Sequence, residues 1–566
     1  MLASLLVLIQ CGQGAAASQE PAGPLPDIEA ASSSPNSFRI FNAVHSALRQ
    51  WGSSIQHNGL SFFPVTVPEG NLFYHGGHDT ERPDTFEWLA FEMEHASQFT
   101  RCYEFDDPSN SSSVVNEDRE MGRKLSLHGR VASIQAESQQ AHEGGEQIAF
   151  SPSDAQHALT RDDDHDKRPP NRRPGRPPSA RGYLQTYRAA RPLKLLYLDG
   201  MAAAKCNLGT LDSQDNILLV ADDEKDPIRR EWERADGLCA LAREWGSIDG
   251  FVRMEAGFEI IYCDFSAGAG LDLVSAHGSP WRNETHASAG EPVGGEWSVM
   301  GMFEWLRASA ARYHGLPGGR AVVDFSGMVS AFAYDVNTTN PDADRPDLPR
   351  IVNASLEERR GIRDRVRDVL LARTGKAAST VDWQAVVDNI VTRFSDRLWF
   401  LAKGPLSARS IRSELAILLY PFLDFPDDTS LEQVSKPVER CTDIHLSPVT
   451  QHQHLWTPED RAVHAAVHSV SHSICSDLFA MRREAHATNG TASGDEDAAR
   501  TVRRLAQDLR SRLDWTTWKD CGRCPGPEQT CFVAMFPFGG VEDHFAPRCK
   551  RQDEVGMGYF MGGRRR

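Results

Sequence analysis

Residues 182–200 read GYLQTYRAARPLKLLYLDG, and this stretch decides the fold of the N-terminal half. Its first part, 183–187, places successive side chains on alternating faces, and its second part, 193–198, is an apolar run that ends in Asp199-Gly200. Both patterns are typical of short β-strands, half-buried in the first case and buried in the second. We therefore expect two strands here.

Strand and helix patterns alternate on both sides of this stretch. Further strands are expected at 62–67, 72–75, 88–91, 248–254, 258–264 and 321–324. Helical periodicity predicts helices near 41–51, 93–99, 229–245 and 299–313. Together they indicate an α+β domain with a mixed sheet over residues 36–340.

Two segments of this half lack such patterns. Residues 19–35 are rich in Ala, Ser and Pro and are expected to be a flexible entry segment. Residues 106–181 are rich in Ser, Gln and acidic residues and end in a run of Arg and Pro. They offer too little apolar surface to offset chain entropy, so we expect a disordered insertion.

The chain becomes largely helical after residue 341. Ser355 and Glu358 form a capping box, and Asp382 opens a second helix that runs to about residue 403. Thr457-Pro458 begins a long helix, and an apolar period at 502–513 marks the last one. We expect a helical region over 341–514 and a Cys-rich tail, 515–566, packed on the preceding domains.

Three features indicate an extracellular protein. Residues 1–18 hold a short apolar run followed by an A-x-A cleavage pattern, which predicts a signal peptide. The cysteines beyond this leader are even in number, which suits an oxidising compartment. Glycosylation acceptors occur at Asn110, Asn283, Asn337, Asn353 and Asn489. The sequence therefore predicts a secreted glycoprotein.

Four cysteines cluster in the tail, at Cys521, Cys524, Cys531 and Cys549. Thiolates at this spacing can bind zinc in a cytosolic protein. The secretory signals favour disulfides instead, although spacing does not choose among the three possible pairings.

Charge and hydropathy exclude two classes of partner. The net charge of −17 argues against nucleic acid, which requires a basic surface. No apolar run after the leader is long enough for a transmembrane helix. A host or cell-surface protein is compatible as a partner with the predicted extracellular location, but nothing in the sequence identifies a partner.

Three sequence blocks could carry chemistry. The first, 72–77, reads LFYHGG; the second, 88–96, reads WLAFEMEHA; the third joins 248–252, IDGFV, to 258–262, FEIIY. Their order and character resemble the three-block pattern of the ADP-ribosyltransferase fold. The resemblance covers roughly residues 60–275, and it implies NAD as the substrate.

The resemblance also implies roles for individual residues. Glu259 would be the catalytic carboxylate that stabilises a cationic ribosyl transition state. His75 would bind a ribose hydroxyl, and Trp88 or Phe91 would stack on nicotinamide. If the protein is an enzyme, we expect ADP-ribosyl transfer or NAD glycohydrolysis. Three features depart from the family pattern: Gly77 replaces the usual Ser or Thr, the second block lacks Ser-Thr-Ser, and a long insertion separates this block from the later strands.

Other patterns leave alternatives open. His464, His468 and His472 share one side of a helix and could chelate zinc or copper, although boundary residues beside a buried stripe explain them as well. Asp199, Asp264 and Asp324 end three strands; a secreted glycosidase would use two such carboxylates, whereas ordinary turns also place Asp there. A non-catalytic secreted effector on a similar scaffold is a further alternative.

Two strings, residues 182–200 and CFVAMFPFGGVEDHF at 531–545, resemble uncharacterised secreted proteins of filamentous fungi. This likeness supports the extracellular prediction and implies no activity.

Overall fold

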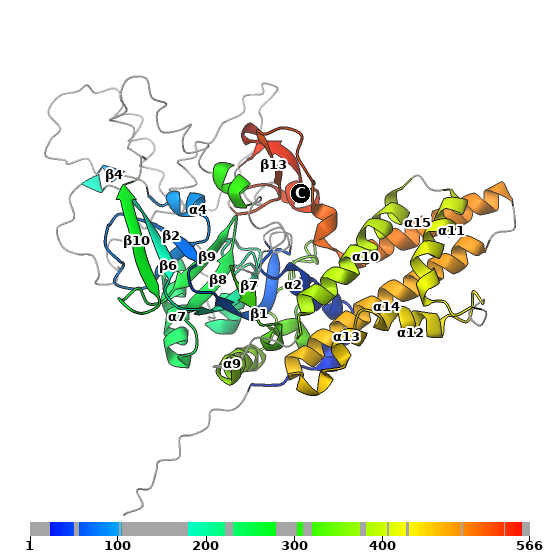
Figure 1. The fold of residues 1–566 in the computed structure, drawn as a ribbon, viewed down its shortest axis with the longest axis horizontal. Coiled ribbons are helices and arrows are strands. Elements are labelled where there is room, and N and C mark those ends of the chain that lie inside the picture. Colours follow the sequence, from blue (N-terminus) through cyan, green and yellow to red (C-terminus); the bar gives the residue numbers. More distant parts are fainter. Residues whose placement is uncertain are drawn as a thin grey trace, which may run out of the picture.

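The computed structural model describes most of the chain (Figure 1). The described ranges are 23–49, 56–100, 103–104, 179–180, 182–220, 230–278, 303–309, 320–373, 381–404, 407–425, 430–487, 491–536 and 538–556. The expected signal peptide lies outside these ranges, as do nearly all of the expected insertion and Cys102.

A ten-stranded mixed sheet forms the N-terminal half, in the order β10-β6-β2-β3-β9-β8-β7-β1-β11, with β12 paired to β1. Among the described strands of this sheet, β7 and β8 form the one parallel pair. The strands are β1 (Asn58–Val67), β2 (Leu72–Gly77), β3 (Glu87–Ala90), β6 (Tyr183–Ala189), β7 (Leu193–Gly200), β8 (Gly250–Met254), β9 (Phe258–Tyr262), β10 (Leu271–Gly278), β11 (Val322–Val323) and β12 (Val329–Ser330). The α+β prediction is thus confirmed at this level.

Helix α7 (Glu231–Trp245) crosses from β7 to β8 and packs on the sheet. Its buried side includes Ala235, Leu238 and Ala242. A disulfide joins Cys239 of this helix to Cys263, just after β9. Parallel strands need such a crossover, and the crossover brings the carboxyl ends of β7 and β8 to the same edge of the sheet.

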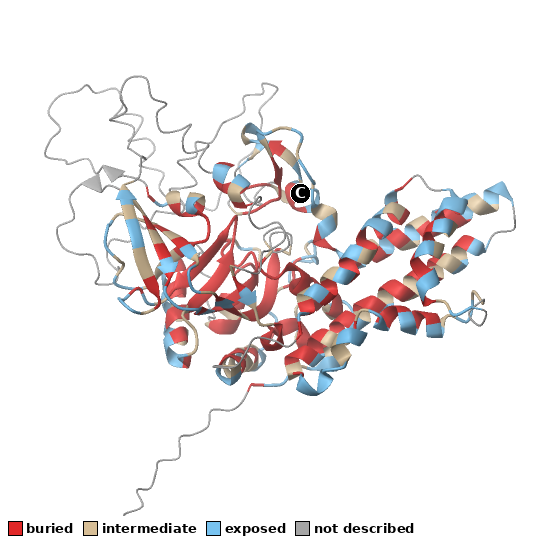
Figure 2. Ribbon diagram, viewed as in Figure 1, coloured by how far each residue is buried: buried red, intermediate tan, exposed pale blue. Residues whose placement is uncertain are grey.

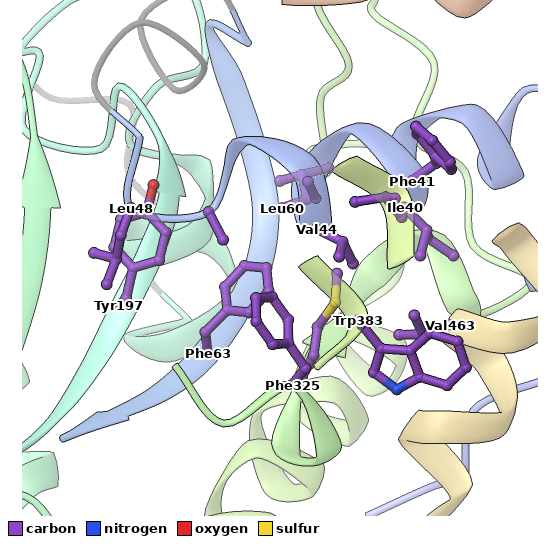
Figure 3. Packing of buried hydrophobic residues seen from close by; sticks show 14 of the residues in the cluster. Ile40, Phe41, Val44, Leu48, Leu60, Phe63, Tyr197, Phe325, Trp383 and Val463 are labelled. Atoms are coloured by element: carbon purple, nitrogen blue, oxygen red, sulfur yellow. The ribbon is translucent and has the colours of Figure 1, made fainter. Parts of the chain in front are cut away.

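Helix α2 (Asn36–Ser46) joins the sheet to the helical region. Figure 3 shows Ile40 and Val44 of α2 within one apolar core that also holds Phe63 of β1, and Trp383 and Val463 of the helical region. All five side chains are almost fully buried. The two halves therefore share a core, and the central strands are buried throughout (Figure 2).

Helix α9 (Leu356–Arg373) lies below the sheet, and the helices that follow it extend to one side (Figure 1). The longer helices of this group are α10 (Trp383–Lys403), α11 (Ala408–Leu419), α12 (Ser435–Asp443), α14 (Pro458–His486) and α15 (Ala492–Leu513). Ser355 and Glu358 cap α9 reciprocally, as predicted. Asp382 caps α10, and Thr457 with Asp460 forms a capping box at α14.

We expect Thr457→Ala to lower the free energy of unfolding by about 1 kcal/mol, because it removes the N-cap acceptor of a 29-residue helix. Chemical denaturation followed by tryptophan fluorescence measures the change. Thr450→Ala is the control, since the Thr450 hydroxyl bonds only locally, to the Ser447 carbonyl. Equal midpoints for the two variants would contradict the capping role.

The tail carries β13 (Gln529–Phe532), α16 (Val541–Phe545) and β14 (Arg548–Arg551). It packs on the preceding regions through Trp515, which stacks on Phe41, and Trp518, which donates a hydrogen bond to the Ser395 carbonyl. Its four cysteines are at disulfide distance, paired Cys521–Cys531 and Cys524–Cys549, rather than grouped around a zinc site.

Two further findings concern segments for which the sequence indicated little. Residues 28–32, inside the segment expected to be flexible, form the short helix α1 (Ile28–Ser32), whose first turn Asp27 caps. A fourth disulfide joins Cys441 of α12 to Cys475 of α14. Cys206 is a free thiol, hydrogen-bonded to Thr210.

Candidate metal centre

Charged side chains from four segments meet at the carboxyl ends of β7 and β8. In open sheets with parallel strands, this edge is where ligands bind. The backbone there is tied together, since Ala203 N donates to the Met254 carbonyl. Ion pairs of 3.9 Å or less link the members of this charged cluster, which are Glu92, His95, Lys205, Glu231, Arg253, Glu255 and Glu259.

Arg253 is the central cation of the cluster, and its side chain is fully buried. The β8–β9 register places it directly opposite Glu259. Its guanidinium donates to Glu259 (Nε–Oε1 3.0 Å), to Glu231 and to Gln214 (Nη1–Oε1 2.9 Å). Burial raises the pKa of Glu231, but Arg253 and Lys205 outweigh it and lower that pKa to about 2. Arg253 therefore helps to keep Glu231 ionised inside the fold.

His95 is the one imidazole of the cluster, and it comes from the short helix α4 (Met93–Ser97). Its ring stacks on Trp305, with centroids 4.3 Å apart. Nε2 lies 3.5 Å from Glu255 Oε1 and Nδ1 lies 3.8 Å from Glu92 Oε2. Burial lowers the pKa of His95, but the two carboxylates outweigh it and raise that pKa to about 9. His95 therefore carries a proton at neutral pH.

Lys205, in the segment after β7, closes the other side of the cluster. Its Nζ lies 3.7 Å from Glu255 Oε2 and 3.9 Å from Glu231 Oε1. Burial raises the pKa of Glu255, but Lys205 and His95 outweigh it, and the pKa is lowered. Glu255 is thus ionised between two cations.

Several polar atoms of the cluster make no hydrogen bond despite their burial. They are Glu92 Oε2, His95 Nδ1 and Glu255 Oε2. Gly257, in the β8–β9 turn, permits the close approach of Glu92, because a Cβ there would lie 2.7 Å from Glu92 Oε2. Each of these atoms faces an opposite charge only at 3.7–3.8 Å, and an ordered water or an ion between them would satisfy them.

Three residues offer ligand atoms that lie within 4.8 Å of one another: His95, Glu255 and Glu259. Metal–ligand bonds of about 2.0–2.2 Å put the ligand atoms of a tetrahedral ion about 3.3–3.6 Å apart, so the three side chains would move together by about 1 Å on binding an ion. One imidazole and two carboxylates form a donor set that suits Zn²⁺ or Mn²⁺.

The structure places the sequence-predicted site residues on both faces of the sheet. The strand register pairs Tyr74 with Ala90 and Ala90 with Glu259, so these three side chains share one face. Trp88, two residues before Ala90, lies on the same face. His75 follows Tyr74 and therefore lies on the opposite face, with Nδ1 2.8 Å from the Trp88 carbonyl oxygen.

Phe91 lies with His75 rather than with Glu259. Its ring meets Phe73, which is on the same face of β2 as His75, at a centroid distance of 5.1 Å. Trp88 instead packs against Trp232 of α7. The expected cleft, with imidazole, aromatic ring and carboxylate together, is therefore not formed by the described residues, and an ADP-ribosyltransferase likeness is not confirmed.

The three strand-end aspartates do not form a pair of catalytic carboxylates either. Tyr262 lies level with the start of β7, since both it and Leu195 pair with Gly250. Asp264 therefore lies near the opposite end of β7 from Asp199. Asp324 forms an ion pair with Arg373 of α9. The alternative of a glycosidase built on these residues gains no support.

Sequence reasoning found Glu259 but missed most of its partners. Glu231 lies on a separate helix, α7, and the pairing of Arg253 with Glu259 depends on the β8–β9 register. One signal was available: Arg253 and Glu259 are both charged residues within apolar strands that flank a tight turn. In paired strands such residues can face each other and neutralise their charges.

Comparisons with known proteins concern the N-terminal half. Residues 31–286 match the family described as the YPL277C N-terminal domain. Two uncharacterised proteins of Saccharomyces cerevisiae are similar: YPL277C is 34% identical over 252 residues, 42% of each chain. YOR389W is 35% identical over 248 residues, 42% of this chain and 33% of its own. The matched region is thus less than half of either relative.

No solved structure matches the chain. All seven members of the charged cluster fall within residues 31–286. The charged cluster and the strands of the sheet from β1 to β10 thus belong to a region that is similar to the YPL277C N-terminal domain family, whereas β11 and β12 lie beyond it.

Proposed function

We propose that the charged cluster binds one divalent transition-metal ion through His95, Glu255 and Glu259 and uses it for hydrolysis. The observation that carries this proposal is the convergence of these three ligand atoms within 4.8 Å. The buried atoms without hydrogen bonds, at Glu92, His95 and Glu255, are compatible with such an ion.

The charge balance of the cluster supports the same reading. Five carboxyl groups face three permanent cations, Lys205, Arg234 and Arg253. The carboxyl groups are those of Glu92, Asp215, Glu231, Glu255 and Glu259. The proton on His95 offsets one of the two excess negative charges. A divalent ion that displaces this proton offsets both, and buried charges require such compensation.

Three protein ligands leave coordination positions open for water and substrate, as in catalytic rather than structural sites. A bound divalent ion lowers the pKa of its water and polarises a substrate oxygen. Lys205 would stabilise negative charge that develops on the substrate, and Glu92 could accept a proton. Metal-dependent hydrolysis is the reaction class that these groups fit.

Metal binding to the full chain tests the proposal. We expect Zn²⁺ and Mn²⁺ to bind with a stoichiometry of one at the cluster in isothermal titration calorimetry. The affinity should rise about tenfold per pH unit from pH 7 and level off near pH 9, because the ion displaces the His95 proton.

Glu259→Gln should reduce this affinity by more than about 100-fold, because it removes a direct ligand. Glu233→Gln is the matched control, since Glu233 lies on α7 next to the cluster with 71% of its side chain exposed. Two results would show that the cluster is a structural ion network only. Both variants could bind metal as tightly as the wild type does, or the metal affinity of the wild type could be independent of pH.

We also propose that the protein passes through the secretory pathway. Four disulfides fit an oxidising compartment, and the described acceptors Asn337 and Asn353 are exposed. The acceptors Asn110, Asn283 and Asn489 lie outside the described residues. No helix in the described ranges combines the length and apolar composition of a membrane span.

A glycosidase that removes N-glycans should lower the apparent mass of the protein recovered from culture medium. Asn337→Gln and Asn353→Gln should each remove one increment of that shift. Protein retained in the cytosol with free cysteines would contradict the proposal.

A further inference from the structure

A second group of potential metal ligands lies on α14, far along the chain from the charged cluster. His464, His468 and His472 follow each other at intervals of four and project from one side of the helix. The ring centroids of His464 and His468 are 6.1 Å apart, and those of His468 and His472 are 6.5 Å apart. His468 and His472 are exposed, so their rings can turn without displacing other groups.

Helix α12 supplies a carboxylate to this row. Asp443, its last residue, has Oδ1 3.6 Å from His468 Nε2. Asp443 also acts electrostatically on His464: burial and the neighbouring His468 lower the pKa of His464, and Asp443 opposes that shift.

The position of Asp443 is fixed by covalent structure. Cys441, two residues before it, forms a disulfide with Cys475, three residues after His472. The helices α12 and α14 are therefore held together beside the histidine row, and the carboxylate and the imidazoles are pre-organised. Imidazoles four residues apart with a nearby carboxylate suit Zn²⁺ or Cu²⁺, which bind nitrogen and oxygen ligands together.

We infer that His464, His468 and Asp443 form a surface site for Zn²⁺ or Cu²⁺ that bridges α12 and α14, independent of the charged cluster. Such an ion would link the two helices next to their disulfide. Because His468 and Asp443 are exposed, the ion should exchange rapidly and a chelator should remove it within seconds.

The test uses the full chain carrying Glu259→Gln, so that the buried site does not contribute. We expect Zn²⁺ to bind with a stoichiometry of one in calorimetry, and Cu²⁺ to give an electron paramagnetic resonance spectrum with nitrogen hyperfine coupling. His468→Ala should remove both signals, and Asp443→Asn should weaken Zn²⁺ binding about tenfold.

His277→Ala is the matched control, because His277 is an exposed histidine on β10 with no such row. Unchanged Zn²⁺ affinity in the His468→Ala chain, or no Zn²⁺ binding in the Glu259→Gln chain, overturns the inference. Neither result bears on the charged cluster. Its metal affinity is measured in the wild-type chain by the dependence on pH and by comparison with the Glu259→Gln chain.

Discussion

Replacing Arg253 with Met is expected to cost about 3–5 kcal/mol of unfolding free energy, because it leaves Glu231 and Glu259 buried without their shared cation. The methionine fills much of the same volume, so loss of packing contributes little. A cost of this size is a large part of the stability of a typical protein. Guanidinium denaturation followed by tryptophan fluorescence measures it.

Arg188→Met is the control for this prediction. Arg188 pairs with Asp272 across β6 and β10, and both side chains are about half exposed. An exposed pair contributes at most about 1 kcal/mol. Equal losses for the two variants would contradict the central place of Arg253 in the fold.

In a metal-free protein, the second large effect is a loss of stability between pH 6.5 and 9. The pKa of His95 rises from 6.5 to about 9 in the folded chain. A raised pKa stabilises the fold fully below pH 6.5, and this contribution disappears as pH rises through 9. The shift corresponds to about 3 kcal/mol. Denaturation in the presence of a chelator at several pH values measures the loss.

His95→Gln separates this contribution from others. Asp199 and Glu87 also have pKa values raised by burial, to about 7, but they remain in the variant. The difference in unfolding free energy between wild type and His95→Gln should therefore shrink by about 3 kcal/mol across this window. A constant difference would show that His95 is not protonated in the fold.

Much of the fold was predictable because local patterns decide it. The alternation at 183–187 and the apolar run at 193–198 became β6 and β7, and the capping residues Ser355, Asp382 and Thr457 mark helices where expected. These signals act over a few residues, so one sequence suffices to recognise them.

The order and register of the strands could not be predicted from the sequence, and they decide which side chains meet in the charged cluster. Whether His75 and Glu259 share a face follows from the register of β2, β3 and β9, and a change of one residue reverses the faces. The pairing of Arg253 with Glu259 likewise depends on the short turn between β8 and β9. Glu259 was recognisable on its own, since a carboxylate in an apolar strand needs a partner.

The cysteines show the same limit. Their secretory context favoured disulfides, and eight of them are paired, but spacing did not reveal Cys239–Cys263 or Cys441–Cys475. These bridges join segments 24 and 34 residues apart whose proximity depends on tertiary packing.

Anomalous X-ray diffraction from crystals grown with Zn²⁺ at pH 8 tests the metal centre most directly. We expect a peak at the zinc edge bonded to His95, Glu255 and Glu259, at about 2.0–2.2 Å from each ligand atom. The peak should be absent in crystals of the His95→Gln chain. An ordered cluster without a zinc peak, with His95 still bridging Glu92 and Glu255, would contradict the claim that these residues form a metal site.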